Sequence, residues 1–179
     1  MTKKEEITRV IEKILNQEVD EETIRKRIMV LSTFLKVAME EKDNIMQDLA
    51  IMLKADIANK GGKLLQNAIL TGDVEKIILL IKAGVKVTAK NDFGKDNWAI
   101  ELASCEGKTE AVKLLIINGA DINAGLSVAA ENGQKDVVKF LIENGADVTA
   151  NDNRAVKEAF DGGHKEVVEL LIKAGASFS

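Results

Sequence analysis

The sequence predicts an all-α fold in which four repeated helix-turn-helix units follow an N-terminal helical segment. Glycine and proline are absent from residues 1–60, whereas all 13 glycines fall in the rest of the chain. The absence of proline and tyrosine removes the turn and strand signals expected of a β-sandwich. The change in composition near residues 61–62 divides the chain. We therefore expect an N-terminal helical segment at residues 1–60 and the repeats at residues 61–179.

Two amphipathic patterns occupy the N-terminal segment. Apolar residues at positions 7, 10, 11, 14 and 15 predict a helix that ends near Gln17. Asp20 is a candidate N-cap, and apolar residues then recur in heptad steps from Ile24 to Met52. This stripe fits either one helix over residues 21–58 or two helices separated at residues 40–44. We favour two helices, because a hairpin buries the stripe within one chain.

The N-terminal segment has two possible roles. A stack of repeats needs a terminal cap, because the first repeat otherwise exposes its apolar face to water. The heptad stripe with its nearby methionines is alternatively a surface for self-association or for a partner. The sequence therefore predicts a cap or association element, and a monomer or a homodimer formed through residues 21–58.

Four blocks in the second segment share one internal spacing. The pairs Gly72 and Gly84, Gly107 and Gly119, Gly133 and Gly145, and Gly163 and Gly175 are each separated by 12 residues. The apolar residues between them predict an amphipathic helix that ends at a glycine with positive φ. A shorter apolar helix precedes each block and carries an alanine four residues before the first glycine, which lets paired helices approach closely: Ala68, Ala103, Ala129 and Ala159.

The stretches AVKLLIINGADIN, VVKFLIENGADVTA and AENGQKDVVKFLIENGAD resemble the ankyrin repeat family, and the resemblance covers residues 61–179. It implies an ankyrin-repeat solenoid of four helix-turn-helix units. The family's usual T-P-L-H tetrapeptide is replaced here by residues 98–101 (WAIE) and 154–157 (RAVK). These proline-free repeats are similar to those of giant-virus and intracellular-bacterial ankyrin proteins.

The repeats are unevenly spaced along the chain. The intervals between their first glycines are 35, 26 and 30 residues, against a family period of about 33. The finger loop Val85–Asn97 is therefore full-length or slightly long, while the loop at Ala120–Ala124 is nearly deleted. We expect one finger to stand out from the surface.

Composition and motifs argue against catalysis, cofactors and nucleic acid. One Cys and one His cannot form a zinc site, and the glycine-rich phosphate loops are missing. A net charge of −4 gives no attraction to a phosphate backbone. The longest apolar runs are short, so we expect no membrane span. The single Cys105 suits a reducing compartment, which predicts the cytoplasm, or the host cytoplasm for a pathogen or viral protein.

The resemblance implies a non-enzymatic protein-binding module, such as an adaptor, that uses the concave face of fingers and first helices. Two alternatives stay open: an inhibitor of effector or immunity type that occludes a target enzyme, and a structural protein that self-assembles through the N-terminal heptad helices. Trp98 either contacts the partner or packs the base of the finger. The predicted partner-binding residues are Asn91, Asp92, Phe93, Lys95, Asp96, Trp98, Cys105, Glu106, Glu131, Asn132, Arg154 and Asp161.

Overall fold

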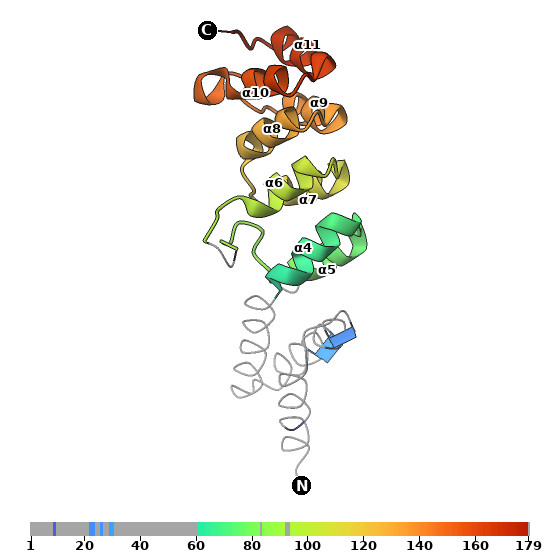
Figure 1. The fold of residues 1–179 in the computed structure, drawn as a ribbon. Helices are drawn as coiled ribbons and strands as arrows, with labels where there is room; N and C mark the ends of the chain where they lie inside the picture. Colours follow the sequence, from blue (N-terminus) through green and yellow to red (C-terminus); the bar gives the residue numbers. More distant parts are fainter. Residues whose placement is uncertain are drawn as a thin grey trace. The chain divides into compact units, whose positions relative to one another are not determined.

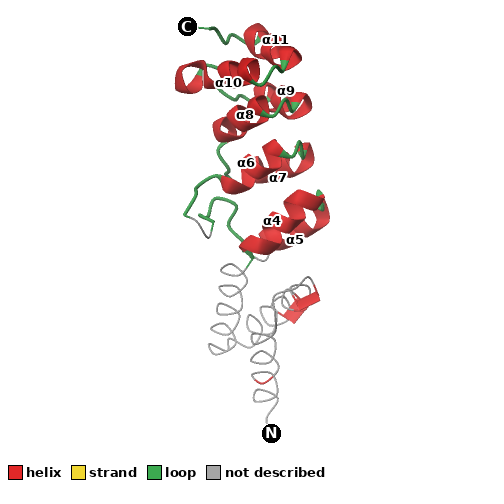
Figure 2. Cartoon of the chain, in the orientation of Figure 1, coloured by secondary structure: helices red, strands yellow, loops and turns green. Residues whose placement is uncertain are grey.

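The computed structural model describes residues 9, 22, 23, 26, 29, 30, 61–82, 84–91 and 94–178. Every regular element in these ranges is an α-helix, and none is a strand (Figure 2). The all-α prediction is therefore confirmed for this part of the chain. The few described residues before position 61 are helical. The predicted helix ending near Gln17 and the choice between one and two helices at 21–58 fall outside the described ranges.

The chain divides into two compact units. One comprises residues 1–65 and 78–86, and the other comprises residues 66–77 and 87–179. The second unit holds six complete helices and carries the features discussed below. The boundary that the sequence suggests near residue 61 stays a prediction.

Eight helices in the described ranges form four consecutive pairs, as the repeat pattern predicts. Each pair has a first and a second helix joined by a tight turn. The pairs are α4 (Gly62–Thr71) with α5 (Val74–Lys82), α6 (Trp98–Cys105) with α7 (Thr109–Ile117), α8 (Ile122–Glu131) with α9 (Lys135–Glu143), and α10 (Ala150–Asp161) with α11 (Lys165–Lys173).

Helices α6 to α11 stack in two layers (Figure 1). The first helices pack against each other in the order α6, α8, α10, and the second helices follow in the order α7, α9, α11. Each first helix also packs on the second helix of its own pair. Ile100, Leu141 and Leu171, one from each of these three pairs, are fully buried, so each pair contributes to the core.

The turns of the repeats follow one backbone pattern. At the end of α8, Gly133 has a φ of 64° and the next amide, that of Gln134, donates to the carbonyl of Ala129 at 2.9 Å. At the end of α9, Gly145 has a φ of 89° and the amide of Ala146 donates to Leu141 at 3.0 Å. Such bonds satisfy the last carbonyls of a helix and require a left-handed residue. The predicted glycine caps of the second helices are confirmed, and the first helices end in the same way.

Small residues allow the helices to approach closely. The four repeat alanines are completely buried: Ala68, Ala103, Ala129 and Ala159. Gly125 in α8 faces α6 so closely that a Cβ there would lie 3.0 Å from Oγ of Ser104 and 3.1 Å from Cδ1 of Ile100. Close packing between first helices therefore depends on side chains with little or no bulk.

The connections between pairs differ in length, as the repeat intervals predict. Helix α6 begins at Trp98, after the long finger, whereas α8 begins only five residues after α7 ends. Asp121 caps α8 by accepting the amide of Asn123 at 2.9 Å. The start of α10 departs from a regular helix, since residues 151–153 all have left-handed backbone angles. Their Asn-Asp-Asn sequence tolerates this conformation better than most.

Candidate functional site

The finger ends in a closed turn. The amide of Asn91 donates to the carbonyl of Lys95 at 3.1 Å, and the Oδ1 of Asn91 accepts the amide of Lys95 at 2.9 Å. Gly94 has a φ of 75°, which the turn requires. Asp92 and Phe93, which the sequence places at this tip, are not among the described residues. The turn therefore fixes the backbone position from which the Lys95 side chain extends.

Trp98 connects the finger to α6. Its indole Nε1 donates to the carbonyl of Ala89 at 2.8 Å, and only 9% of the residue is exposed. The indole therefore packs the base of the finger, which is one of the two roles expected for it. One part of the side chain still borders the groove described next.

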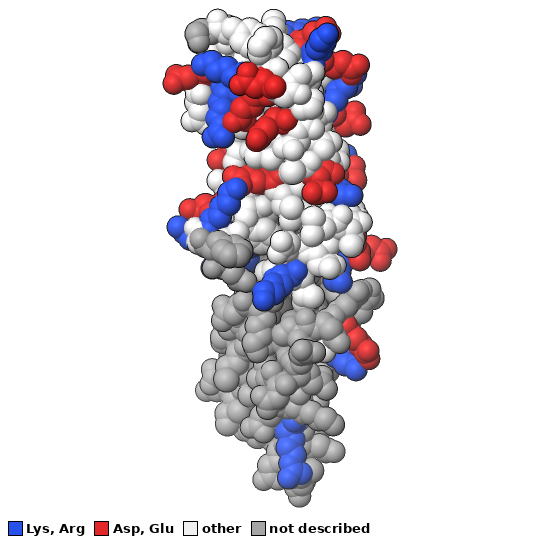
Figure 3. Space-filling view, viewed as in Figure 1, with Lys and Arg blue, Asp and Glu red and all other residues white. Residues whose placement is uncertain are grey.

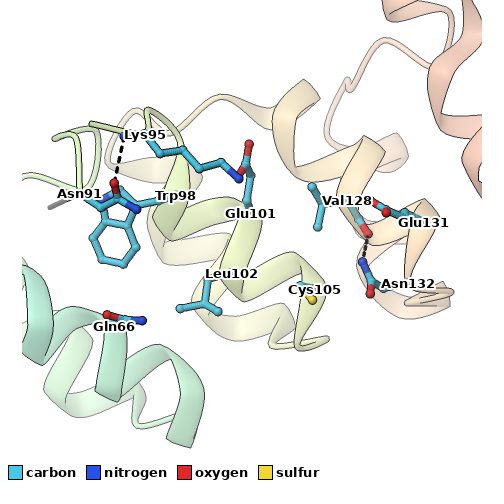
Figure 4. A pocket seen from close by; sticks show the side chains of 10 residues that line it. All are labelled: Gln66, Asn91, Lys95, Trp98, Glu101, Leu102, Cys105, Val128, Glu131 and Asn132. Atoms are coloured by element: carbon cyan, nitrogen blue, oxygen red, sulfur yellow. Dashed lines mark hydrogen bonds and ion pairs between the residues drawn. The ribbon is translucent and has the colours of Figure 1, made fainter. Parts of the chain in front are cut away.

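An open groove of about 480 Å³ lies beside the finger and the first helices. The finger contributes two polar residues, α4 contributes one, and facing positions on α6 and α8 form the rest (Figure 4). The lining mixes amides, carboxylates and apolar side chains. Its residues are Gln66, Asn91, Lys95, Trp98, Glu101, Leu102, Cys105, Val128, Glu131 and Asn132.

Two ion pairs involve basic side chains of the finger and the first helices. The Nζ of Lys95 reaches across the groove to Oε2 of Glu101 (Figure 4). On α10, Nε of Arg154 lies 2.6 Å from Oε1 of Glu158. The hydrogen bond and charge of Glu158 raise the pKa of Arg154, and the charges of Glu131 and Glu101 raise it further. Arg154 is therefore influenced by three carboxylates, on a molecule whose surface mixes acidic and basic side chains (Figure 3).

The groove brings together half of the residues that the sequence predicts for partner binding: Asn91, Lys95, Trp98, Cys105, Glu131 and Asn132. Asp96 instead lies on the finger, 3.2 Å from Nζ of Lys90. Glu106, Arg154 and Asp161 are exposed but do not line the groove.

Sequence reasoning missed Gln66, Glu101, Leu102 and Val128. The signal for two of them was present, because positions 98, 101, 102 and 105 follow the spacing of one helix face.

Side chains at equivalent positions tie consecutive repeats together. Gln134 donates from Nε2 to the carbonyl of Cys105 at 2.7 Å, and His164 donates from Nε2 to the carbonyl of Glu131 at 2.9 Å. Each donor follows the glycine that ends a first helix, and each acceptor lies near the end of the preceding first helix. His164 therefore has a structural role, because it links two repeats. Gln134 forms the equivalent link one repeat earlier.

Two asparagines make a second repeated link. Asn123 Oδ1 accepts the amide of Asp147 at 2.8 Å, and Asn153 Oδ1 accepts the amide of Ser177 at 3.0 Å. Both asparagines lie ten residues before the glycine that ends their helix, and Asn97 occupies the same position in the preceding repeat. This recurrence was visible in the sequence and marks contacts between repeats.

The described residues offer few groups for chemistry. Cys105 is a half-buried free thiol, and no three His, Cys, Asp or Glu residues of the described ranges gather in a way that could hold a metal ion. No helix in that part of the chain is both long and apolar enough to cross a lipid bilayer. The amides, carboxylates and apolar side chains that line the groove are suited to recognition by hydrogen bonds, charge and apolar contact.

Comparison with known proteins finds one family. Residues 100–179 match the family model described as ankyrin repeats, in three copies. The match begins within α6 and runs through α11, so it covers the stacked pairs on the C-terminal side of the finger. No curated protein matches the chain.

Proposed function

Because residues 100–179 are ankyrin repeats, which are protein–protein interaction modules that typically carry no catalytic activity, we propose that this chain binds a protein partner through its groove face. We define the groove face as the finger, at residues 85–97, with the exposed sides of the first helices α6, α8 and α10. The partner is a protein segment that enters the groove, and the chain acts as an adaptor in the cytoplasm.

The groove is the observation that supports this proposal. Half-buried Leu102 and Val128 provide apolar contact, and Glu101 and Glu131 provide charge, all within one depression. A volume of about 480 Å³ is large enough for one or two side chains. Protein interfaces concentrate their binding free energy in such partly apolar depressions with a polar rim.

The remaining predicted residues extend the proposed contact beyond the groove. Exposed Glu106, Arg154 and Asp161 belong to the same row of first helices, and Asp96 lies on the finger. These four residues form the rim of the proposed interface, while the predicted contacts Asp92 and Phe93 lie outside the described residues. Rim residues exclude water from the centre of an interface and individually contribute less to affinity. A net charge of −4 favours a protein over a nucleic acid as the partner.

The inhibitory alternative uses the same face. An enzyme whose active site is occluded would lose activity on binding, so assaying a captured enzyme separates an inhibitor from an adaptor. The self-assembly alternative uses residues 21–58, which are mostly outside the described ranges. It predicts a mass in solution that rises with protein concentration.

Site-specific photocrosslinking tests the proposal. A photoreactive p-benzoylphenylalanine replaces Gln66, an exposed residue of the groove, in the full chain. A matched control places the same group at Ile117 of α7, a residue that is 80% exposed and does not line the groove. Crosslinking in a lysate of the source cells should capture a discrete partner from position 66 only. Equal capture from both positions, or capture from position 117 alone, contradicts the proposal.

A further inference from the structure

At the α8 end of the groove, Glu131 and Asn132 offer hydrogen-bond acceptors. The ammonium group of Lys95 is held by Glu101. The amide of Asn132 donates from Nδ2 to the carbonyl of Val128 at 2.9 Å, which directs its Oδ1 away from that carbonyl (Figure 4). The Oδ1 of Asn132 and the carboxylate of Glu131 therefore face the groove as acceptors. A segment that fits here must bring donors.

Glu131 is the charged group that the groove leaves available. It is the last residue of α8, its side chain is exposed, and it forms no ion pair with any other described residue. The last turn of α8 contains no basic residue. The negative end of the helix dipole therefore adds to the charge of this carboxylate. Its backbone is fixed, because its carbonyl accepts the bond from His164.

Two neighbouring basic side chains make their ion pairs with carboxylates other than Glu131. Arg154 on α10 is bound to Glu158, and Lys95 on the finger is bound to Glu101. The charges of Glu131 and Glu101 contribute to the raised pKa of Arg154, which reports a negative field on this side of α10. A cation from another molecule is therefore favoured at Glu131.

The groove also has the apolar walls that a long cationic side chain needs. Leu102 on α6 and Val128 on α8 both line it and are half-buried (Figure 4). An arginine or lysine buries its aliphatic stem along such surfaces while its charged end reaches a polar group. Stem contacts and a charged end are thus available within the same depression.

We propose that the occupant of the groove is an arginine side chain on an exposed segment of the partner protein, with its guanidinium on Glu131 and its stem between Leu102 and Val128. This inference rests on the function proposed above and specifies the chemistry of the partner. Arginine fits better than lysine, because its planar fork of donors can bind the Glu131 carboxylate with two N–H groups and the Oδ1 of Asn132 with another.

Peptide selection tests the inference without knowledge of the partner. The probe is a library of random short peptides displayed on phage and selected on the immobilised full chain. Enriched peptides are then synthesised, and their affinities are measured by fluorescence polarisation for the unchanged chain, for Glu131→Gln and for Glu143→Gln. Glu143 is a matched control, because it is exposed at the end of α9 and lies outside the groove.

The inference predicts that enriched peptides share an arginine. Replacing that arginine by alanine, or Glu131 by glutamine, should each weaken binding about tenfold, which corresponds to about 1.4 kcal/mol. The two changes together should weaken binding little more than either alone, because they remove the same contact. Glu143→Gln should leave the affinity unchanged. Arginine replaced by lysine in the peptide should give an intermediate affinity.

Other outcomes separate this inference from the proposed function. If the enriched peptides lack basic residues but bind the Val128→Arg variant of the chain more weakly, the arginine inference is wrong and the groove remains the binding site. If no substitution in the groove changes the affinity of the enriched peptides, both the arginine inference and the groove as binding site are wrong. A selection that enriches no sequence contradicts both as well.

Discussion

The turn edge of this protein repeats from one helix pair to the next, whereas the groove face varies. The turn edge comprises the residues that join first to second helices, such as Gly107–Lys108, Gly133–Gln134 and Gly163–His164. It repeats the same backbone angles and hydrogen bonds from pair to pair. The groove face changes with each repeat, because the finger is long in one and nearly absent in the next. Residues that recur with the period maintain the stack, and residues that break the recurrence are free to serve recognition.

The contacts between repeats show the same contrast. Gln134 and His164 differ chemically but make the same bond to the preceding repeat, at 2.7 and 2.9 Å. On the groove face, equivalent positions hold Cys105, Glu131 and Asp161, which have no shared partner. Changes at the turn edge should therefore cost stability, and changes on the groove face should alter binding. The predictions below run from the largest expected loss of stability to the smallest.

Gly133→Ala should be the most destabilising of these changes, with a loss of about 3 kcal/mol. Gly133 has a φ of 64°, and a Cβ there would collide with the His164 ring, 2.8 Å from its Cγ. Gly145→Ala is the control, because its φ is 89° but nothing lies within 4 Å of the added atom. It should lose only about 1 kcal/mol, the strain of the backbone alone. Urea unfolding measures both, and equal losses would show that the ring contact has no effect.

Gln134→Ala should cost about 1 kcal/mol, since it removes the bond to the carbonyl of Cys105. Gln134→His should restore most of that stability, because His164 makes the equivalent bond one repeat later. The two variants are compared by thermal unfolding under the same conditions. A histidine variant as unstable as the alanine variant would refute the equivalence of these positions.

Glu166→Gln should produce a smaller change that depends on pH and salt. Nζ of Lys135 lies 2.6 Å from Oε2 of Glu166. This bond and charge lower the pKa of Glu166 from 4.5 and raise the pKa of Lys135 from 10.5. The stabilisation from Glu166 is present above pH 4.5 and is lost as the pH falls through the lowered pKa. The stabilisation from Lys135 is lost as the pH rises through its raised pKa.

Melting temperatures of the unchanged chain and of Glu166→Gln measure this pair. They should differ slightly at neutral pH in low salt and converge in acid, where the carboxylate is protonated. High salt should reduce the difference, because both side chains are exposed to solvent. A difference that persists unchanged in acid would rule out the ion pair as its cause.

Glu131→Gln should change stability least, by no more than about 0.5 kcal/mol in either direction. Neutralising a carboxylate at a helix C-terminus relieves an unfavourable interaction with the dipole, while it removes a favourable one with Arg154. Calorimetric unfolding checks this value. A loss above 1 kcal/mol would place Glu131 among the residues that maintain the fold and would undermine its role in the groove.

The repeated parts of the fold were predictable from sequence. Glycine spacing and the buried alanines indicate where helices end and which faces meet, because these positions must satisfy backbone geometry in every repeat. The left-handed residues 151–153 were not predicted. Asn, Asp and Asn tolerate this conformation without requiring it, so neighbouring contacts such as the bond from Ser177 to Asn153 decide it.

The candidate site was only partly predictable. Lys95, Glu131 and Asn132 were predicted from their positions in the finger and the first helices, and they line the groove. The repeat register made this possible, because it indicates which polar residues near helix ends are exposed. Leu102 shares a helix face with the predicted Trp98 and Cys105, so its place in the groove could have been found from the spacing. Val128 is half-buried at the groove, and only tertiary structure shows this.

The affinity of the captured partner for two matched variants tests the central claim most directly. Val128→Arg places a cation in the groove, and Ile117→Arg places the same cation on exposed α7. Titration calorimetry with the full chain should show binding weakened at least about tenfold by Val128→Arg and unchanged by Ile117→Arg. Unchanged affinity for a folded Val128→Arg variant would contradict the claim that the groove face binds the partner.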